Sequence, residues 1–235
     1  MARLYGETEE INSDKVKDFF NDRANKNVES DLSIVLFQDK ENSERRNNEE
    51  NEFVAEKIDF ANKKVLEIGC GIGRWAEFFH GKCASYLGLD YSENLIDIAK
   101  SSHDFDDCKF QVMSAFDIKI EELLIEPPFD ILLISQVLMY INDEDLTILI
   151  DEVNGILNED KQIFITEPIS CMESRLTLKD FYSNELETDY NAIYRTEREY
   201  MEFFKKFNFN EINSYDIFMD LNERTETQYK SFVMK

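Results

Sequence analysis

Short apolar runs alternate with amphipathic segments through the middle of this 235-residue chain. The runs have the length of strands, and the segments between them place apolar residues at the three- or four-residue spacing of a helix face. Strands that alternate with helices indicate a parallel sheet covered on both faces. The predicted strands span residues 64–68, 86–90, 110–114, 131–135 and 162–167.

Several helix starts can be read from capping residues. Ser13 and Ser92 each precede a helical apolar pattern, and their hydroxyls are suited to accept hydrogen bonds from a first turn. Thr196 and Glu199 form a capping box before a third helix. A fourth helix is predicted from about Asp143, where a long apolar stripe begins.

Two regions depart from this alternation, one before the first strand and one after the fifth. The end of the chain predicts two further strands, roughly 209–218 and 226–234, joined by a polar turn. The predicted units are an N-terminal helical cover (1–58), an α/β core (59–168), an insertion or cap (169–195) and a C-terminal helix with a strand pair that completes the core (196–235).

Three of the seven glycines in the chain lie within five residues, at Gly69, Gly71 and Gly73. Glycine is needed where the backbone takes a positive φ or approaches a ligand closely. This turn follows the first predicted strand and precedes helical spacing at 74–79, which is the opening of a βαβ unit. Ligands of open α/β sheets bind at the carboxyl ends of the strands, so the turn is the first candidate site.

An acidic residue at the end of the second strand completes this candidate site. Asp90 lies 19 residues after Gly71, a distance suited to a carboxylate that accepts both ribose hydroxyls of an adenosine ligand. A nicotinamide dinucleotide site shares that acid, but it needs G-x-G-x-x-G/A, and Arg74 occupies the third position here. Glu67, just before the turn, also favours a cationic ligand over a pyrophosphate.

Composition narrows the possible partners. The chain has 26 basic and 50 acidic residues, a formal net charge of −24, which disfavours nucleic acid and anionic membranes. No apolar run approaches the roughly 18–20 residues of a membrane span, and the polar start of the chain predicts no signal peptide. The four cysteines lack CxxC spacing, so we expect reduced thiols, a cytoplasmic protein and no metal site.

Four segments in register resemble the motifs of class I S-adenosylmethionine-dependent methyltransferases. Residues 65–73 (VLEIGCGIG) look like the first motif, and residues 87–92 (LGLDYS) look like the second. Residues 111–117 resemble the adenine-proximal loop, and residues 129–135 resemble the fourth strand. The resemblance runs from about residue 63 to 168 and implies a doubly wound, seven-stranded mixed sheet. It also implies S-adenosylmethionine as cofactor and S-adenosylhomocysteine as product.

The resemblance further implies roles for individual residues of the core. Glu67 would support the amino end of the cofactor, and Asp90 would bind the ribose hydroxyls. Shorter segments around residues 22–24, 37–39 and 45–47 are similar to bacterial methyltransferases that tailor surface-polysaccharide sugars, which would direct Arg23 or Arg46 to the cofactor carboxylate. The implied cofactor residues are Glu67, Gly69, Cys70, Gly71, Gly73, Trp75, Asp90, Tyr91, Ser114, Ala115, Phe116, Ser135, Gln136 and Arg46.

Methyl transfer requires an acceptor held in line with an activated methyl group, and a hydroxyl acceptor usually needs a general base. His80 and His103 are both expected at the far ends of helices, away from the ligand edge. Residues expected at the ligand edge are Glu167, Tyr140 and Gln136 for catalysis, and Tyr140, Tyr194 and Arg195 for the substrate. For Glu167 a capping or ion-paired carboxylate stays an alternative, and for Arg195 a surface arginine.

We therefore expect an α/β methyltransferase acting on a small-molecule acceptor, such as a sugar hydroxyl of a surface-polysaccharide precursor. Two rivals stay open. One is an NAD-dependent oxidoreductase, and the other is a protein that binds the cofactor without catalysis.

Overall fold

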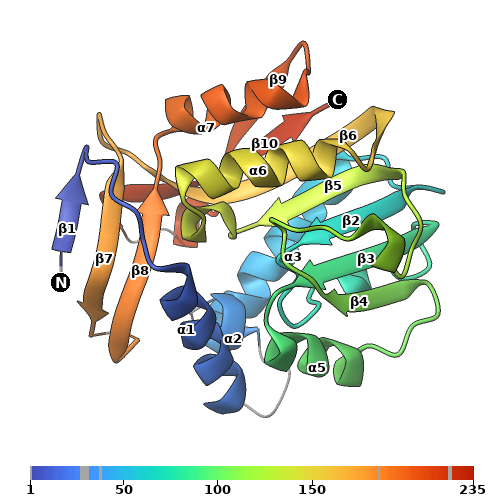
Figure 1. Ribbon diagram of the computed structural model, residues 1–235, viewed down its shortest axis with the longest axis horizontal. Helices are drawn as coiled ribbons and strands as arrows, with labels where there is room; N and C mark the ends of the chain where they lie inside the picture. Colours follow the sequence, from blue (N-terminus) through green and yellow to red (C-terminus); the bar gives the residue numbers. More distant parts are fainter. Residues whose placement is uncertain (1, 27–31, 37–38, 185, 222–223) are drawn as a thin grey trace.

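The computed structural model describes residues 2–26, 32–36, 39–184, 186–221 and 224–235. Its centre is a seven-stranded sheet in the order β4-β3-β2-β5-β6-β10-β9 (Figure 1). The strands from β4 to β6 pair in parallel, whereas β10 is antiparallel to both β6 and β9. The predicted seven-stranded mixed sheet is confirmed. The strands are β2 (Lys64–Ile68), β3 (Ser85–Asp90), β4 (Cys108–Val112), β5 (Phe129–Ser135), β6 (Leu157–Ser170), β9 (Ile212–Ile217) and β10 (Thr227–Met234).

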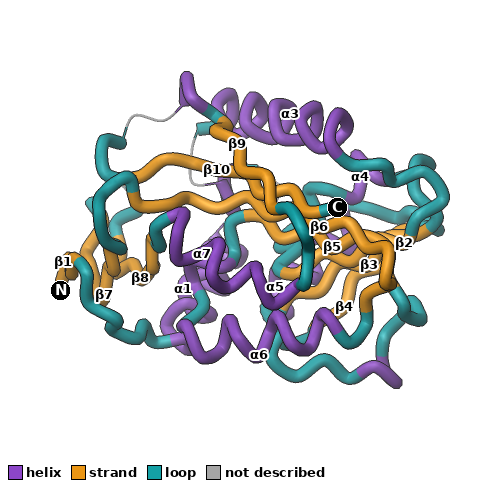
Figure 2. Tube along the Cα trace, turned by 90° about the horizontal axis from the view of Figure 1, so that it is seen from above, coloured by secondary structure: helices purple, strands orange, loops and turns teal. Residues whose placement is uncertain are grey.

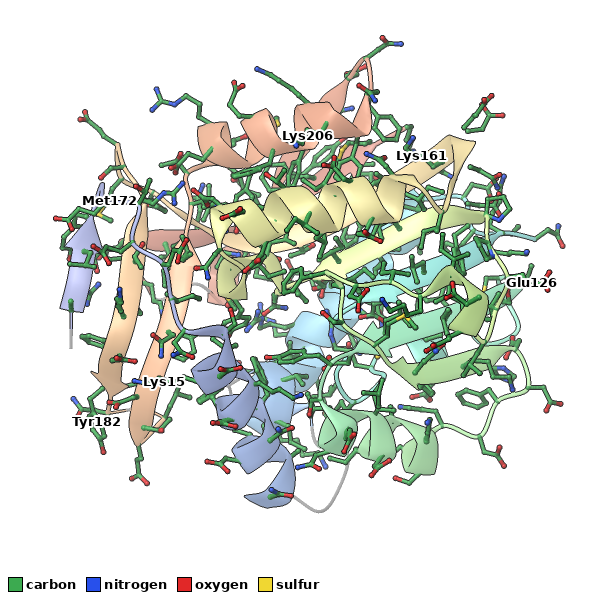
Figure 3. The ribbon with its side chains drawn as sticks, viewed as in Figure 1. Lys15, Glu126, Lys161, Met172, Tyr182 and Lys206 are labelled. Atoms are coloured by element: carbon green, nitrogen blue, oxygen red, sulfur yellow. The ribbon has the colours of Figure 1, made fainter. Side chains whose placement is uncertain are left out.

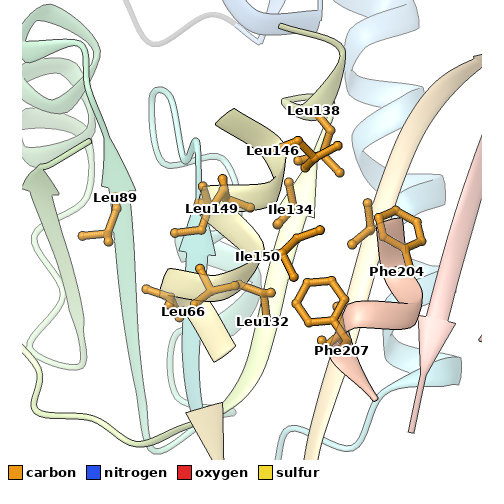
Figure 4. Close-up of a cluster of buried hydrophobic side chains, with 14 of the residues drawn as sticks. Leu66, Leu89, Leu132, Ile134, Leu138, Leu146, Leu149, Ile150, Phe204 and Phe207 are labelled. Atoms are coloured by element: carbon orange, nitrogen blue, oxygen red, sulfur yellow. The ribbon is translucent and has the colours of Figure 1, made fainter. Parts of the chain in front are cut away.

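Alternation along the strands sends side chains to two separate cores. Leu66 of β2 and Leu132 of β5 pack under the helices α6 and α7 (Figure 4). Val65 and Ile131, one residue away on the same strands, pack on the opposite face under α3, α4 and α5. Figure 2 shows α3 and α6 on opposite sides of the sheet. The helices are α3 (Lys40–Lys57), α4 (Ala76–Phe79), α5 (Glu93–Ser102), α6 (Asp143–Asn154) and α7 (Glu197–Phe204).

A second, three-stranded sheet lies beside the main one, in the order β1-β7-β8 (Figure 1). The insertion supplies β7 (Leu176–Ser183) and β8 (Thr188–Tyr194), and the start of the chain supplies β1 (Ala2–Tyr5). The sequence predicts a helical cover over residues 1–58, but residues 2–5 of this segment form a strand. The strand β1 was missed because its pairing partner on β7 lies more than 170 residues away.

The helix α1 (Ser13–Lys26) links the three-stranded sheet to the main one. Its apolar side packs on β8, where Val16 and Phe19 join a cluster with Tyr190. Lys15 of α1 lies beside the hairpin (Figure 3), and its ammonium pairs with the Asp180 carboxylate of β7 at 2.9 Å.

The helix cap expected at Ser13 is corrected by one residue. The Asn12 carboxamide accepts from the Lys15 backbone N–H at 3.0 Å, so Asn12 caps α1 and Ser13 is already helical. The caps expected at Ser92 and Thr196 are confirmed, because each side chain accepts from a first-turn N–H.

Among the described residues, none of the helices has the length and apolar character to cross a bilayer.

Candidate functional site

A cavity of about 200 Å³ opens at the carboxyl ends of β2, β3 and β5. The glycine turn forms one wall, and residues 113–116 after β4 form another. The loop 136–141 after β5 and the helices α1 and α2 (Ser33–Leu36) close the remaining sides. The lining includes these residues of the expected cofactor set: Glu67, Gly69, Cys70, Gly71, Asp90, Tyr91, Ser114, Ala115, Phe116, Ser135 and Gln136.

Close packing around the glycine turn leaves no room for a side chain at Gly69 or Gly73. Gly69, Gly71 and Gly73 all have positive φ, of 72°, 53° and 76°. A Cβ at Gly69 would lie 2.3 Å from Cγ2 of Val137, in the loop across the cavity. A Cβ at Gly73 would lie 2.6 Å from the ring of Phe110. The lack of a side chain at Gly69 therefore lets the turn lie against the loop 136–141. The lack of a side chain at Gly73 is required by packing on Phe110, away from the cavity lining.

Asp90 is fixed at the cavity by two backbone hydrogen bonds. One carboxylate oxygen accepts from Gly71 N–H and the other from Ser92 N–H, both at 2.9 Å. Burial raises the pKa of Asp90 to about 6, although these hydrogen bonds oppose the shift. A carboxylate has about four acceptor positions, so lone pairs stay available for the hydroxyls of a ligand.

Glu67 lies deeper in the same wall. Its carboxylate accepts from the Tyr86 hydroxyl, and burial raises its pKa to about 8, opposed by that hydrogen bond and by the charge of Arg74. Glu67 can therefore change protonation near neutral pH. A cationic group bound nearby would favour its ionised form.

Arg74, Glu50 and Ser135 form a buried network that ties α3 to the cavity wall. The Arg74 guanidinium donates to the Glu50 carboxylate and to the Ser135 hydroxyl, each at 2.7 Å. That hydroxyl donates in turn to the other Glu50 oxygen at 2.7 Å. Glu50 lies in the acidic segment 47–52 (NNEENE), whose composition is typical of a solvated helix face, yet its side chain is buried. The buried face of α3 consists of Ser43, Arg46, Glu50 and Val54, and because three of these are polar, no apolar stripe marks it in the sequence.

Arg46 lies behind the cavity and reaches it through Gln136. The Arg46 guanidinium donates to Gln136 Oε1 at 2.6 Å and to the Leu36 carbonyl at 3.1 Å, and it lies 4.4 Å from the centre of the Tyr229 ring. No carboxylate in the described part of the chain pairs with this arginine, which is 2% exposed. Arg46 Nε and Gln136 Nε2 are buried donors with no acceptor among the described residues. Because unsatisfied buried donors are costly, these two N–H groups are suited to bind an anionic group of a ligand.

The residues expected to act on the acceptor fall into two groups. Tyr140 and Gln136 line the cavity. The Tyr140 hydroxyl lies 2.7 Å from the Tyr190 hydroxyl, and burial raises the pKa of Tyr140 well above its usual value, so it stays a neutral phenol. It can orient an acceptor by hydrogen bonding but is poorly suited to remove a proton.

Glu167, Tyr194 and Arg195 lie behind the cavity wall rather than at its edge. The Glu167 carboxylate is fully buried and accepts from the backbone N–H groups of residues 137–139. Glu167 was expected to face the methyl acceptor, but its side chain is directed to the loop instead. Arg195 is buried and bound to Asp143 and to the same loop, which excludes its interpretation as a surface arginine.

Two other residues of the expected sets also lie away from the lining. Trp75 is fully buried between α4 and the sheet, and the expected helix at 74–79 is reduced to Ala76–Phe79. Arg23 donates to the carbonyls of Ser33 and Ile34 and so joins α1 to α2. Gln38, in one of the segments similar to sugar-tailoring enzymes, lies outside the described residues.

The helices α1 and α2 also line the cavity, which their sequences do not reveal. Their pattern predicted helices, but nothing in it indicated which elements they would cover. Both histidines lie elsewhere, with His80 Nδ1 2.7 Å from the Asp107 carboxylate. The lining residues from these helices are Ser13, Asp14, Val16, Lys17, Phe20, Val35 and Leu36.

The family profile described as "Methyltransferase domain" matches residues 65–160, which include the glycine turn, Asp90 and the loop 136–141. Residues 65–160 form a methyltransferase domain. A curated relative of this chain, phosphoethanolamine N-methyltransferase 1 of Triticum aestivum, is 31% identical over 161 residues. The match covers 67% of the chain and 29% of the relative, so the chain spans under a third of that protein's length.

Solved structures show the same fold at low sequence identity. A SAM-dependent methyltransferase from Leishmania major has a TM-score of 0.68 and 15% identity, with 95% of this chain and 82% of that chain covered. Phosphoethanolamine N-methyltransferase 1 of Haemonchus contortus, in complex with phosphoethanolamine and S-adenosylhomocysteine, has a TM-score of 0.68 and 17% identity. There the coverage is 95% of this chain and 49% of that chain.

Proposed function

We propose that this chain is an S-adenosylmethionine-dependent methyltransferase that acts on a small-molecule acceptor. The observation that carries the proposal is the joint position of the glycine turn and Asp90. Both line one cavity, and Asp90 binds the turn through Gly71 while keeping acceptor capacity for a ligand. This arrangement suits an adenosine ligand without a pyrophosphate, because the turn lacks the third glycine of a dinucleotide site.

The residues of the cavity fit the parts of the cofactor. Asp90 would hold the ribose hydroxyls, while Tyr91, Ala115 and Phe116 would border the adenine. When bound, the cofactor supplies a methyl group activated by a sulfonium. Glu67 and the wall around it would face the cationic end.

The cofactor carboxylate requires donors, and two buried donors at or behind the cavity wall have no partner among the described residues. We assign Arg46 and Gln136 to this group, because Arg46 Nε and Gln136 Nε2 lack acceptors among the described residues. An anion there would also neutralise a buried guanidinium that pairs with no carboxylate in the described part of the chain.

Two acceptor classes deserve testing. A sugar hydroxyl of a surface-polysaccharide precursor follows from the similarity of the N-terminal segments to sugar-tailoring enzymes. An amine is the second candidate, because the described cavity lining contains no histidine to deprotonate a hydroxyl. The matched relative is itself an N-methyltransferase of phosphoethanolamine.

Calorimetric titration of the purified chain with S-adenosylhomocysteine and, separately, with NAD tests the cofactor assignment. We expect binding of the first and none of the second, whereas tight binding of NAD would favour an oxidoreductase. Transfer of radiolabelled methyl to nucleotide sugars and to phosphoethanolamine then tests the acceptor. Cofactor binding without transfer to either class would support a non-catalytic binding protein.

A further inference from the structure

The loop 136–141 after β5 carries four residues into the cavity lining. Gln136, Val137, Tyr140 and Ile141 all line it, and the segment Leu138–Tyr140 forms a single turn of 3₁₀ helix. Because Val137 also packs on Gly69, a movement of this loop would change both the shape of the cavity and its contact with the glycine turn.

The loop begins with a strained residue. Gln136 has φ of 61°, in the left-handed region that residues other than glycine, asparagine and aspartate seldom occupy. Such a conformation persists only where the surroundings hold it, and it is concentrated at functional sites. Its backbone N–H donates to the Thr166 carbonyl at 2.7 Å, which fixes the start of the loop to β6.

Glu167, the next residue of β6, holds the following turn. One carboxylate oxygen accepts from Val137 N–H at 2.8 Å and from Leu138 N–H at 2.7 Å. The other accepts from Met139 N–H at 3.2 Å. A single buried carboxyl group therefore accepts from three consecutive amides and caps the start of the 3₁₀ turn.

Arg195 holds the same loop by its carbonyl groups. Its guanidinium donates to the Leu138 carbonyl at 2.8 Å and to the Ile141 carbonyl at 2.6 Å. Asp143, at the start of α6, accepts from Nε and Nη2 of the same guanidinium and so fixes its orientation. Arg195 is fully buried, and its charge faces Glu167 and Asp143.

We infer that Glu167 and Arg195 are positioning residues that hold the loop 136–141 in its binding conformation. Neither lines the cavity, so neither is a catalytic residue; each acts through the backbone groups of residues 137–141. The inference rests on the proposed function, because the loop presents Gln136 to the proposed cofactor carboxylate.

The test combines amide exchange with ligand binding in Glu167→Gln. A glutamine has one acceptor oxygen, and its NH₂ group would face N–H donors, so at least one loop amide loses its partner. We expect exchange at residues 137–139 to accelerate, and the affinity for S-adenosylhomocysteine to fall about tenfold. Hydrogen–deuterium exchange and calorimetric titration measure the two effects.

Thr166→Val is the matched control on the same strand. The Thr166 hydroxyl is buried and pairs with the Ser231 hydroxyl at 2.8 Å, so its loss should lower thermal stability without releasing the loop. We expect unchanged exchange at 137–139 and unchanged affinity. Equal weakening of binding in both variants, or unaltered loop exchange in Glu167→Gln, would overturn the positioning role.

A second variant keeps the test decisive if Glu167→Gln fails to fold. Arg195→Lys retains the charge, but a single ammonium cannot reproduce the fork that spans two carbonyls. It should accelerate exchange over the same loop and weaken the same ligand. If both variants are unfolded while Thr166→Val folds, the pair is a folding requirement and the inference is wrong. If the native chain itself does not bind S-adenosylhomocysteine, the proposed function fails, and the exchange data alone decide the positioning role.

Discussion

Gly69 and Gly81 have nearly the same left-handed backbone, with φ of 72° and 70°, but different surroundings. A Cβ at Gly69 would overlap Val137, whereas a Cβ at Gly81 would meet nothing within 4 Å. Gly81→Ala therefore measures the conformational cost alone, about 1–2 kcal/mol. Gly69→Ala should cost a further ~1–3 kcal/mol through overpacking and should abolish binding of S-adenosylhomocysteine.

Chemical denaturation of both glycine variants, followed by calorimetric titration, measures the difference. Val137→Ala combined with Gly69→Ala should recover part of the lost stability, because it removes the methyl groups that clash. Equal stability of the two single variants would contradict the steric explanation.

Asp90 provides the second prediction at this scale. Asp90→Ala removes the carboxylate that binds Gly71 and is proposed to bind the ribose, so the affinity for S-adenosylhomocysteine should fall about 10- to 100-fold. Asp97→Asn on the exposed side of α5 is the control and should bind normally. An unchanged dissociation constant for Asp90→Ala, measured by calorimetry, would refute the ribose assignment.

The positions of some site residues could be predicted from the sequence, and those of others could not. Asp90, Gly69 and Gly71 could be placed at the cavity because their chemistry and spacing have few alternative uses, whereas Gly73 lies in the turn but not in the lining. Arg46 was named only through a resemblance of short segments, and Glu50 was not named, since its role depends on where α3 packs, which no local pattern records. Glu167 was assigned to the correct edge of the sheet, but the direction of its side chain was decided by a loop 28–30 residues earlier.

At the scale of elements, the capping box of α7 is testable on its own. Thr196 and Glu199 exchange hydrogen bonds between side chain and backbone at the start of this helix. Thr196→Ala should destabilise the protein by about 1 kcal/mol and lower its Tm by about 2–4 °C. Ser102→Ala, at the exposed end of α5, should leave the Tm within about 1 °C by the same scaling. Calorimetry of both variants measures the two changes in Tm. Equal changes in Tm for Thr196→Ala and Ser102→Ala would contradict a capping role for Thr196.

The elements with strong periodicity were predicted well. The stripe from Asp143 becomes α6, and the tail strands become β9 and β10 within a few residues of the expected bounds. The expected strand at 110–114 is displaced by two residues to Cys108–Val112, because short apolar runs do not fix their ends. The strand β1 could not be predicted, since four residues of mixed polarity become a strand only through their partner.

At the scale of the whole molecule, two buried carboxylates make stability depend on pH. Burial raises the pKa of Glu67 and of Glu167 to about 8, above the value of about 4.5 in an unfolded chain. Between these values the folded state binds more protons than the unfolded state, so their contribution to stability falls as pH rises. We expect the Tm to fall as pH rises from about 4.5 to 8, and scans above pH 6.5 isolate these two groups from Asp90, whose pKa burial raises to about 6.

Calorimetric scans of Glu67→Gln test this dependence, because the variant lacks one of the two groups and should show a shallower fall. The acids whose pKa values are lowered, such as Asp143 and Glu199, are already ionised throughout this range and do not interfere. A slope identical to that of the native chain would show that Glu67 does not titrate there.

The strand β1 also constrains the order in which the protein can assemble. Residues 2–5 pair with residues 176–179, and the next backbone N–H, that of Gly6, donates to the Arg175 carbonyl at 3.0 Å. On the ribosome, β1 must therefore wait until residues 176–179 have been synthesised before its partner exists. The helix α1, which follows it and closes the cavity, packs on both α5 and β8, and its packing on β8 is subject to the same delay.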